Sequence, residues 1–415
     1  MSRRTTAVVV VIVCVVMNLL ARGVSETYAV FLLPLEQEFG WRSAALTSVY
    51  STYMLVHGLS APLVGLLFDR LGPRLLYAGG ALCLGGGYFL AAHLDSVWQF
   101  HLCIGVLGGI GVAAMGMVPA SALVSRWFRA RLGTAMGITY AGLGMGVIAV
   151  VPFTQWLIER DGWRSAYTSL GSGLLILLPL LLLLPWKHFA AGNPEFRSER
   201  GPRAVAGWTL AQALRSSAFW GLFAVFFFTA VAIWGTVLQA VAYLVEIGFE
   251  PLQAATAFGV LGIMSVLGMI ATGWLADRVG RRVTVSVTFA LTIGGIGLLF
   301  LLEQFPYYWL LVVFVLCFGV SQGSRGPVIS TLCAELFPGG GIGAIYGSVT
   351  MGMGTGAAFG AWVSGWLRDA TGSNEAGFLF AAVAALLGLS QFWFIPALAR
   401  GGHATSDEGD GREER

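Results

Sequence analysis

Long apolar stretches alternate with short polar segments along most of the chain. A helix needs about 20 apolar residues to cross the hydrocarbon core of a bilayer, and the chain contains twelve runs of about that length. The pattern therefore predicts an all-α membrane protein with twelve transmembrane helices. The predicted spans are roughly 7–33, 44–67, 75–93, 99–124, 132–157, 165–186, 218–246, 252–275, 283–303, 307–333, 342–367 and 374–397.

The longest polar interruption lies between the sixth and seventh predicted spans and separates two sets of six helices. We predict an N-terminal six-helix bundle over residues 1–186 and a C-terminal six-helix bundle over residues 218–397. The polar and basic segment 187–217 is predicted to be a cytoplasmic linker. Residues 398–415 are rich in polar and charged side chains, which predicts a disordered cytoplasmic tail.

Positive charge is distributed unevenly among the polar segments. If the N-terminus is inside, the inner segments carry eighteen Lys and Arg residues and the outer loops carry four, which are Arg42, Arg160, Arg164 and Arg368. Cytoplasmic loops of membrane proteins collect basic residues. The count therefore predicts a multi-pass protein of the cell (inner) membrane with both termini in the cytoplasm.

The composition agrees with a lipid environment. The 415 residues are 57% hydrophobic and only 11% charged, whereas soluble chains carry about 25% charged residues. Soluble enzymes and nucleic-acid-binding proteins are disfavoured, and the small net charge of +3 gives no reason to expect a nucleic-acid partner. The five cysteines are scattered singly without metal-ligand spacing, so we expect no metal and no cofactor.

Two sequence patterns occur once in each half of the chain. The first, G-x-x-x-D-R-x-G-x-R, follows the second predicted helix of each half, and its copies are 208 residues apart. Its members are Gly65, Asp69, Arg70, Gly72 and Arg74, and then Gly273, Asp277, Arg278, Gly280 and Arg282. The second is a set of glycines that opens the fifth helix of each half, repeated after 210 residues. Two parallel six-helix pseudo-repeats, related by an axis along the membrane normal, are therefore expected.

The duplicated loop is similar to the signature of the major facilitator superfamily. Within that superfamily the chain most resembles the monocarboxylate transporter and oxalate:formate antiporter group. The resemblance rests on residues 27–31, 38–41, 79–81, 126–131, 135–137 and 140–142. It implies the twelve-helix facilitator fold, with the first, fourth, seventh and tenth helices lining a central cavity.

The chain departs from that group at two charged positions. Those transporters carry a lysine in the first helix, whereas this chain has Glu26 there. Their Asp-x-x-x-Arg pattern in the eighth helix falls near Ser265 and Met269, which carry no charge. Both differences argue against a simple lactate-like substrate.

The signature loops also have a physical rationale. Asp69 and Asp277 come just before a following helix, where the helix dipole favours a carboxylate and a neighbouring arginine can pair with it. We predict that the ten residues of the two loops form a conformational latch. A hydrated charged turn that only sets the topology is the alternative.

Charged side chains inside predicted spans indicate the functional site, because lipid tolerates them poorly. Asn18, Arg22 and Glu26 recur at intervals of four residues, which places them on one face of the first helix. Arg325 lies inside the tenth span. We predict a substrate-binding site formed by Arg325, Arg22, Gln322, Ser321, Gln239, Tyr243 and Asn18.

Specific roles follow from the chemistry of these groups. Arg325 is predicted to bind a substrate carboxylate, with Arg22 as a second positive wall across the cavity, because a guanidinium matches a carboxylate bidentately. Alternatively, helix-end carbonyls near Gly326 and Pro327 hold Arg325. Glu26 is predicted to carry the coupled proton, and the alternative is a permanent ion pair with Arg22.

These residues predict a secondary active transporter of a small organic acid anion that works by alternating access and is coupled to protons. A proton-coupled exporter of drugs or another non-carboxylate solute stays open. Residues 319–323 match G-x-S-x-G and raise a third possibility, an intramembrane serine hydrolase with Ser321 as nucleophile. The motif lies within an apolar span and His57 has no nearby acid in the sequence, so we predict no catalytic residues and no enzyme.

Overall fold

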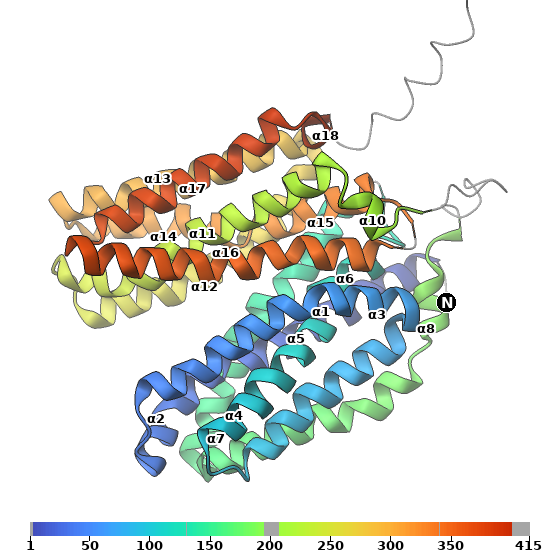
Figure 1. The fold of residues 1–415 in the computed structure, drawn as a ribbon, viewed down its shortest axis with the longest axis horizontal. Helices are drawn as coiled ribbons and strands as arrows, with labels where there is room; N and C mark the ends of the chain where they lie inside the picture. Colours follow the sequence, from blue (N-terminus) through green and yellow to red (C-terminus); the bar gives the residue numbers. More distant parts are fainter. Residues whose placement is uncertain (1–2, 130, 195–206, 340, 401–415) are drawn as a thin grey trace, which may run out of the picture. The chain divides into compact units, whose positions relative to one another are not determined.

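The computed structural model describes residues 3–129, 131–194, 207–339 and 341–400, and most of them are helical (Figure 1). Most of the predicted tail and part of the predicted linker lie outside the described residues. The helices are α1 (Arg3–Glu26), α2 (Tyr28–Phe39), α3 (Ser43–Ala91), α4 (Val97–Phe100), the π-helix η1 (His101–Gly108), α5 (Gly109–Met115), α6 (Met117–Val124), α7 (Leu132–Leu183), α8 (Trp186–Ala191), α10 (Leu210–Ala213), α11 (Ser217–Glu246), α12 (Pro251–Val279), α13 (Arg281–Gln304), α14 (Tyr308–Gln322), α15 (Arg325–Leu336), α16 (Ile342–Thr371), α17 (Glu375–Phe394) and α18 (Pro396–Arg400).

These helices account for the twelve predicted spans. Among the described residues, nine helical stretches are long and apolar enough to cross a membrane. Two of them, in α3 and α7, each contain two spans, because the backbone leaves the helical conformation at Gly72 and at Gly162. The 30-residue α16 provides the remaining span. The predicted twelve-helix fold is therefore confirmed.

The duplication extends from the sequence to the backbone conformation. Gly72 has φ 77° and ψ 175°, and its counterpart Gly280 has φ 89° and ψ 154°. Gly40 and Gly248, also 208 residues apart, have φ values of 64° and 104°. Glycine adopts positive φ without the steric cost of a Cβ atom. The glycines of the signature loop therefore set the sharp turn between two consecutive spans in each half.

The chain forms two compact units. The first comprises Met1–Arg129, Ile138–Ala204 and Tyr346–Thr355, and the second comprises Ala130–Gly137, Val205–Ile345 and Gly356–Arg415. Each unit therefore includes a short segment from the other half of the sequence. Within each unit the long helices lie side by side (Figure 1).

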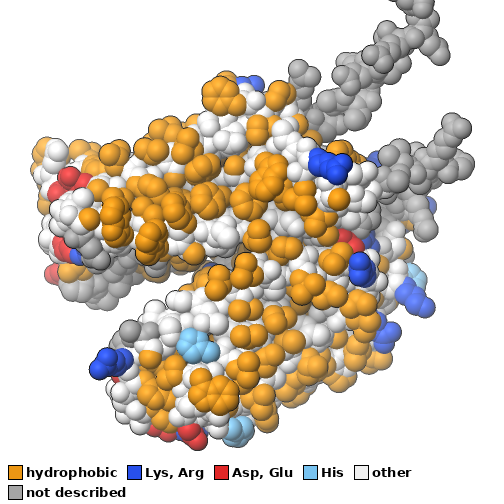
Figure 2. Space-filling view, viewed as in Figure 1, with side chains coloured by type: hydrophobic (Ala, Val, Ile, Leu, Met, Phe, Trp, Pro, Cys, Tyr) orange, Lys and Arg blue, Asp and Glu red, His pale blue; other side chains and the backbone are white. Residues whose placement is uncertain are grey.

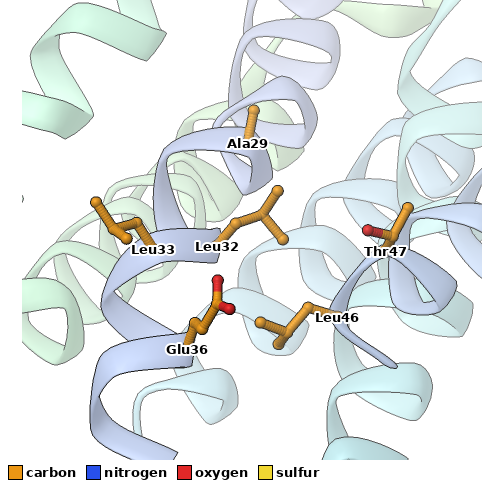
Figure 3. A pocket seen from close by; sticks show the side chains of 6 residues that line it. All are labelled: Ala29, Leu32, Leu33, Glu36, Leu46 and Thr47. Atoms are coloured by element: carbon orange, nitrogen blue, oxygen red, sulfur yellow. The ribbon is translucent and has the colours of Figure 1, made fainter. Parts of the chain in front are cut away.

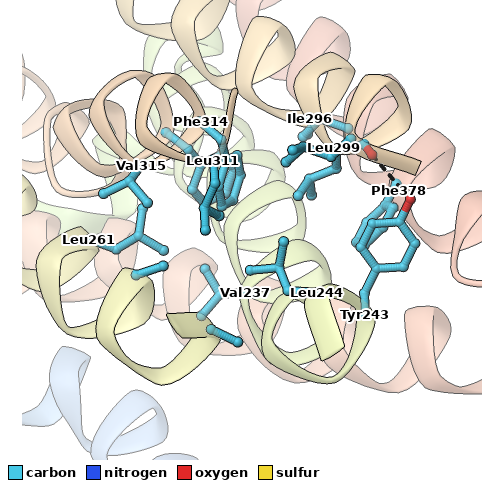
Figure 4. Packing of buried hydrophobic residues seen from close by; sticks show 14 of the residues in the cluster. Val237, Tyr243, Leu244, Leu261, Ile296, Leu299, Leu311, Phe314, Val315 and Phe378 are labelled. Atoms are coloured by element: carbon cyan, nitrogen blue, oxygen red, sulfur yellow. Dashed lines mark hydrogen bonds between the residues drawn. The ribbon is translucent and has the colours of Figure 1, made fainter. Parts of the chain in front are cut away.

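The core of the second unit is an apolar cluster between α11, α12, α13, α14 and α17 (Figure 4). Phe314, Phe318, Leu299 and Phe378 have no exposed surface, and Leu311 is 2% exposed. In a bilayer the tails of lipids are as apolar as these side chains, so tight packing between helices stabilises the unit more than burial from water does.

Large apolar side chains also cover much of the outer surface. Ile176 is 74% exposed, Trp362 68% and Phe394 82%. Figure 2 shows hydrophobic side chains spread over the visible face of each unit, with charged side chains mainly towards the helix ends. This distribution is that of a multi-pass membrane protein, whose outer surface contacts lipid.

Candidate functional site

The first span is interrupted at its charged residues. Helix α1 ends at Glu26, α2 begins at Tyr28, and Thr27 forms a turn between them. The Val24 carbonyl at this interruption accepts from the backbone N–H of Thr27 at 3.2 Å and from two hydroxyls, those of Thr27 at 2.6 Å and Tyr88 at 2.8 Å. Irregular backbone at membrane depth needs such protein partners.

Arg22 and Glu26 form an ion pair beside this interruption. Nη2 of Arg22 lies 2.8 Å from Oε1 of Glu26, and the two side chains are 23% and 21% exposed. The hydroxyl of Tyr50 on α3 donates to both oxygens of the same carboxylate, at 3.0 and 3.1 Å. Glu26 therefore accepts from a guanidinium and from a phenol while part of its surface stays accessible.

Tyr53 and His57 continue the same face of α3. The Tyr53 hydroxyl donates to Oγ of Ser25 at 3.0 Å, and its ring stacks on His57 with a centroid distance of 6.1 Å. Tyr50 and Tyr53 are not among the site residues predicted from the sequence. The signal that was available is their spacing, since Tyr50, Tyr53 and His57 recur after three and four residues and so share one helix face.

Asn18 lies one turn before Arg22 but has different partners. Its side chain is fully buried, and Nδ2 donates to the carbonyl of Thr139 on α7 at 3.0 Å. Its Oδ1 has no hydrogen-bond partner among the described residues. The predicted binding residue Asn18 therefore packs inside the first unit instead of joining the Arg22 and Glu26 pair.

Arg325 begins α15 after a break in the tenth span. Its side chain is 1% exposed, Nη2 donates to the Thr288 carbonyl at 2.9 Å and to the Thr292 hydroxyl, and the guanidinium lies 3.9 Å from the centroid of the Phe289 ring. All three partners belong to α13. Nε and Nη1 have no partner within the described part of the chain, so two of the three guanidinium nitrogens are not hydrogen-bonded.

Ser321 joins the same cluster at the end of α14. Its hydroxyl donates to the Phe318 carbonyl at 2.9 Å and accepts from Thr292 at 2.9 Å. These contacts are with a backbone carbonyl and a threonine, and not with the histidine base that a serine nucleophile needs. Gln322, the last residue of α14, is half-buried.

Gln239 and Tyr243 lie one turn apart on α11 but contact different helices. Oε1 of Gln239 accepts from Nη1 of Arg368 on α16 at 3.3 Å. Tyr243 is 4% exposed, donates to the Leu299 carbonyl and to Glu303, both at 3.1 Å, and packs in the apolar cluster of the second unit (Figure 4).

The second signature loop holds the start of α7 within the second unit. Asp277 accepts from the backbone N–H of Gly133 at 3.0 Å, and from the N–H and the hydroxyl of Thr134 at 2.7 Å each. A Cβ atom on Gly273 would overlap the carbonyl of Gly133, so this approach requires glycine. Arg278 stacks on Trp274, with its guanidinium carbon 4.3 Å from the ring centroid.

The remaining signature residues are arranged as follows. Arg282 stacks on Trp393, with its guanidinium carbon 3.7 Å from the ring centroid. In the first unit Gly65 is buried, Asp69 is half-buried, and Arg70 and Arg74 are exposed. The two copies of the loop therefore share the glycine turn, and in each copy the aspartate is the partly buried acidic residue.

A separate pocket of about 220 Å³ lies beside the C-terminal half of the first span (Figure 3). Apolar side chains form most of its wall, together with one carboxylate and one hydroxyl. Its lining consists of Ala29, Leu32, Leu33, Glu36, Leu46 and Thr47. The pocket does not include the predicted binding residues.

A family model described as Major Facilitator Superfamily matches residues 11–338. The chain belongs to the Major Facilitator Superfamily. The superfamily predicted from the duplicated loop is thereby confirmed, and the protein is a multi-pass membrane transporter by family.

Relatives of this facilitator with curated names include several monocarboxylate transporters. Monocarboxylate transporter 13 of Rattus norvegicus is 30% identical over 384 residues, which cover 90% of this chain and 85% of the relative. Monocarboxylate transporter 12 of Mus musculus is 26% identical over 415 residues, covering 93% of this chain and 85% of the relative. The resemblance to this group is confirmed over nearly the whole chain.

Solved structures of other facilitators share the fold. The proton:xylose symporter XylE, bound to 6-bromo-6-deoxy-D-glucose, superimposes with a TM-score of 0.76 at 16% identity, covering 95% of this chain and 97% of that chain. The E. coli fucose:proton symporter FucP has a TM-score of 0.71 at 17% identity, covering 93% and 98%. At this identity the likeness shows the fold alone.

Proposed function

We propose that this facilitator is a secondary active transporter that moves a small organic acid anion together with protons by alternating access. The observation that supports the proposal is the ion pair between Arg22 and Glu26, which lies at an interruption of the first span and keeps about a fifth of each side chain exposed. Ionisable groups inside a membrane span mark transport pathways and proton relays in general.

Charge balance explains how this pair couples a proton to an anion. When Glu26 takes up a proton, its carboxyl becomes neutral and Arg22 loses the negative partner that lies 2.8 Å away. A substrate carboxylate then restores neutrality, and the guanidinium fork matches its two oxygens. The Tyr50 hydroxyl remains within hydrogen-bond distance of Glu26. Release of the anion and of the proton regenerates the ion pair.

Arg325 is proposed as a second contact for the carboxylate. Its Nε and Nη1 atoms have no partner among the described residues, so each of them can donate to a carboxylate. A buried charge without full compensation costs several kcal/mol, which supports an anionic partner during transport. Ser321 and Gln322, at the end of α14, are proposed to bind the substrate beside Arg325. The alternative is a purely structural role, in which Arg325 is held by backbone carbonyls; in the structure the carbonyl that it contacts is that of Thr288, beside the Thr292 hydroxyl.

Three further parts of the proposal concern the orientation of the chain in the membrane, the two moving bundles and the role of the signature loops. We propose that both termini face the cytoplasm of a cell (inner) membrane, that residues 1–186 and 218–397 form the two moving bundles, and that the loops act as latches. The hydrogen bonds that Asp277 makes to Gly133 and Thr134 support the latch, because breaking and remaking them would accompany a conformational change.

The first experiment identifies the substrate class. Purified protein is heated with a panel of carboxylates, sugars and organic cations, because a ligand that binds the folded state raises its thermal stability. Stabilisation by carboxylates supports the proposal. Stabilisation by organic cations or neutral solutes alone would instead favour the exporter of non-carboxylate compounds.

The second experiment tests proton coupling in proteoliposomes with the carboxylate identified in this way. Glu26→Gln should abolish accumulation driven by a proton gradient and spare exchange of substrate for substrate, because the amide cannot carry the proton. Glu36→Gln is the matched control, since Glu36 lies ten residues further along the same span and lines the separate pocket. Unchanged accumulation in Glu26→Gln would refute coupling at this residue.

A further inference from the structure

Arg325 is a charged group in the interior of the second unit. Among the residues whose burial the structure describes, it is the one charged side chain that is buried, at 1% exposure. A guanidinium group remains protonated in proteins. Its positive charge therefore has to be balanced inside the protein, because burial of an unpaired charge is costly.

The acidic side chains of the surrounding helices do not balance this charge. Arg325 takes part in no ion pair among the described residues. Helices α11, α12 and α13 pack against α15, and the acidic side chains of these four helices contact other groups. They are Glu246, which pairs with Arg368, Asp277, which accepts from Gly133 and Thr134, Glu303, which accepts from Tyr243, and Glu335, which pairs with Arg281.

The groups that do contact the guanidinium are uncharged. Nη2 donates to the Thr288 carbonyl and to the Thr292 hydroxyl, and the ring of Phe289 lies against the guanidinium. Such dipoles, and the negative face of an aromatic ring, attract a cation without cancelling its net charge. Nε and Nη1 have no partner among the described residues, so both are available to donate to an anion.

The backbone at this residue also favours an anion. Helix α15 begins at Arg325, and the side chain of Ser324 at its N-cap makes no cap hydrogen bond. In the described part of the chain the N–H groups of Arg325 and Gly326 have no backbone partner, and Pro327 has no N–H. Unpaired N–H groups and the helix dipole favour negative charge at the amino end of a helix. The guanidinium and the helix end therefore favour an anion independently of each other.

Charge and burial limit the kind of anion. Arg325 is 1% exposed, and Thr292 and Ser321 beside it have no exposed surface, so a ligand held there in this conformation is enclosed by protein. One negative charge neutralises the guanidinium, whereas a multivalent anion such as sulfate would leave a net negative charge buried. A small monovalent ion such as a halide also accepts hydrogen bonds from any direction, so it suits donors that point in different directions.

We infer that Arg325 holds a chloride ion inside the second unit when no substrate is bound. The ion neutralises the guanidinium and accepts from donors that the protein leaves unpaired. During transport a substrate carboxylate takes the place of this ion, which makes chloride a competitor of the substrate. The competition rests on the proposed function, whereas the chloride site itself does not.

Binding of radioactive chloride to the purified full chain in detergent tests the site. We expect saturable binding of ³⁶Cl⁻ at one ion per chain, displaced by bromide and not by isethionate, which is a larger monovalent anion. Crystals grown with bromide should show its anomalous signal beside Nε or Nη1 of Arg325 or at the amino end of α15. Absence of saturable binding, or bromide located only elsewhere, would overturn the inference.

Substitution of Arg325 provides the matched comparison. Arg325→Gln should lose ³⁶Cl⁻ binding, together with the rise in melting temperature that chloride gives over isethionate at the same concentration. Arg215→Gln is the control, because Arg215 is an exposed arginine of the same unit and its loss removes the same charge. Equal chloride binding in Arg325→Gln, or loss of binding in Arg215→Gln, would contradict the assignment. If Arg325→Gln does not fold, the position of bromide in the unchanged protein decides.

A carboxylate that stabilises the protein separates this inference from the proposed function. Displacement of ³⁶Cl⁻ by that carboxylate supports both. If chloride binds with unchanged affinity in saturating carboxylate, the chloride site stands and the proposed contact between Arg325 and the substrate fails. If no chloride binds while carboxylates still stabilise the protein through Arg325, the inference fails and the proposed function stands.

Discussion

The carboxylate of Asp277 accepts hydrogen bonds from both the backbone N–H and the hydroxyl of Thr134, each at 2.7 Å. The N–H of Gly133 donates to the other oxygen at 3.0 Å. These donors belong to the amino end of α7, where unpaired N–H groups and the helix dipole favour an anion. The second signature loop therefore caps the amino end of α7, whose residues up to Gly137 belong to the second unit.

Asp277→Asn should lower the stability of the protein by about 1 to 2 kcal/mol, because the amide keeps the shape of the side chain but loses its charge and one of its acceptor oxygens. The measurement is the free energy of unfolding in detergent. Thr134→Val removes one of the three donors and should cost less. A double variant as destabilised as the sum of the two single variants would show that the residues act independently and not as one cap.

A double variant measures how much of the stability depends on the pairing of Arg22 with Glu26. Arg22→Gln leaves the Glu26 carboxylate without its cation and should destabilise the protein by about 3 kcal/mol, towards the lower end of values for broken buried pairs, because both side chains are partly exposed. The double variant with Glu26→Gln should recover most of this loss. A double variant that stays as unstable as Arg22→Gln would mean that the cost comes from lost packing.

Arg325 is tested by substitutions that separate its charge from its geometry. Lysine keeps the charge and loses the fork, whereas glutamine loses both. If Arg325 binds the substrate, both variants should fold and reach the membrane, with substrate-induced thermal stabilisation weakened in Arg325→Lys and absent in Arg325→Gln. Arg278→Lys is the control for a stacked arginine outside the proposed binding site. A misfolded Arg325→Gln variant, or one with normal binding, would favour the purely structural role, in which Arg325 is held by backbone carbonyls.

Close contact between α1 and α7 in the first unit depends on Gly146. A Cβ atom there would overlap the Leu19 carbonyl and lie 2.9 Å from the nitrogen of Gly23. Gly146→Ala should therefore destabilise the protein by about 1 to 3 kcal/mol, as overpacking does. Gly173→Ala is the matched control on the same helix, because a Cβ atom there meets nothing within 4 Å. Equal thermal stability of the two variants would contradict the close approach.

Hydropathy and repetition in the sequence were enough to predict the architecture. A backbone in lipid must satisfy its own hydrogen bonds, so each long apolar run has to form a helix whatever its neighbours are. The 208-residue repeat likewise predicted two equivalent signature loops, and the structure gives them related turns at Gly72 and Gly280, because positive φ depends on the local chain and on the absence of a Cβ atom. The superfamily followed from the same repeat.

The partners of the intramembrane polar groups were decided only by the tertiary structure. The sequence placed Asn18, Arg22 and Glu26 on one helix face, but Asn18 donates to Thr139 on α7 while Glu26 accepts from Tyr50 on α3. Arg325 likewise contacts three residues of α13. Hydropathy does not indicate which face of a helix that is apolar all round packs against which neighbour. The packing of neighbouring helices, and breaks such as the turn at Thr27, decide which way each polar side chain points.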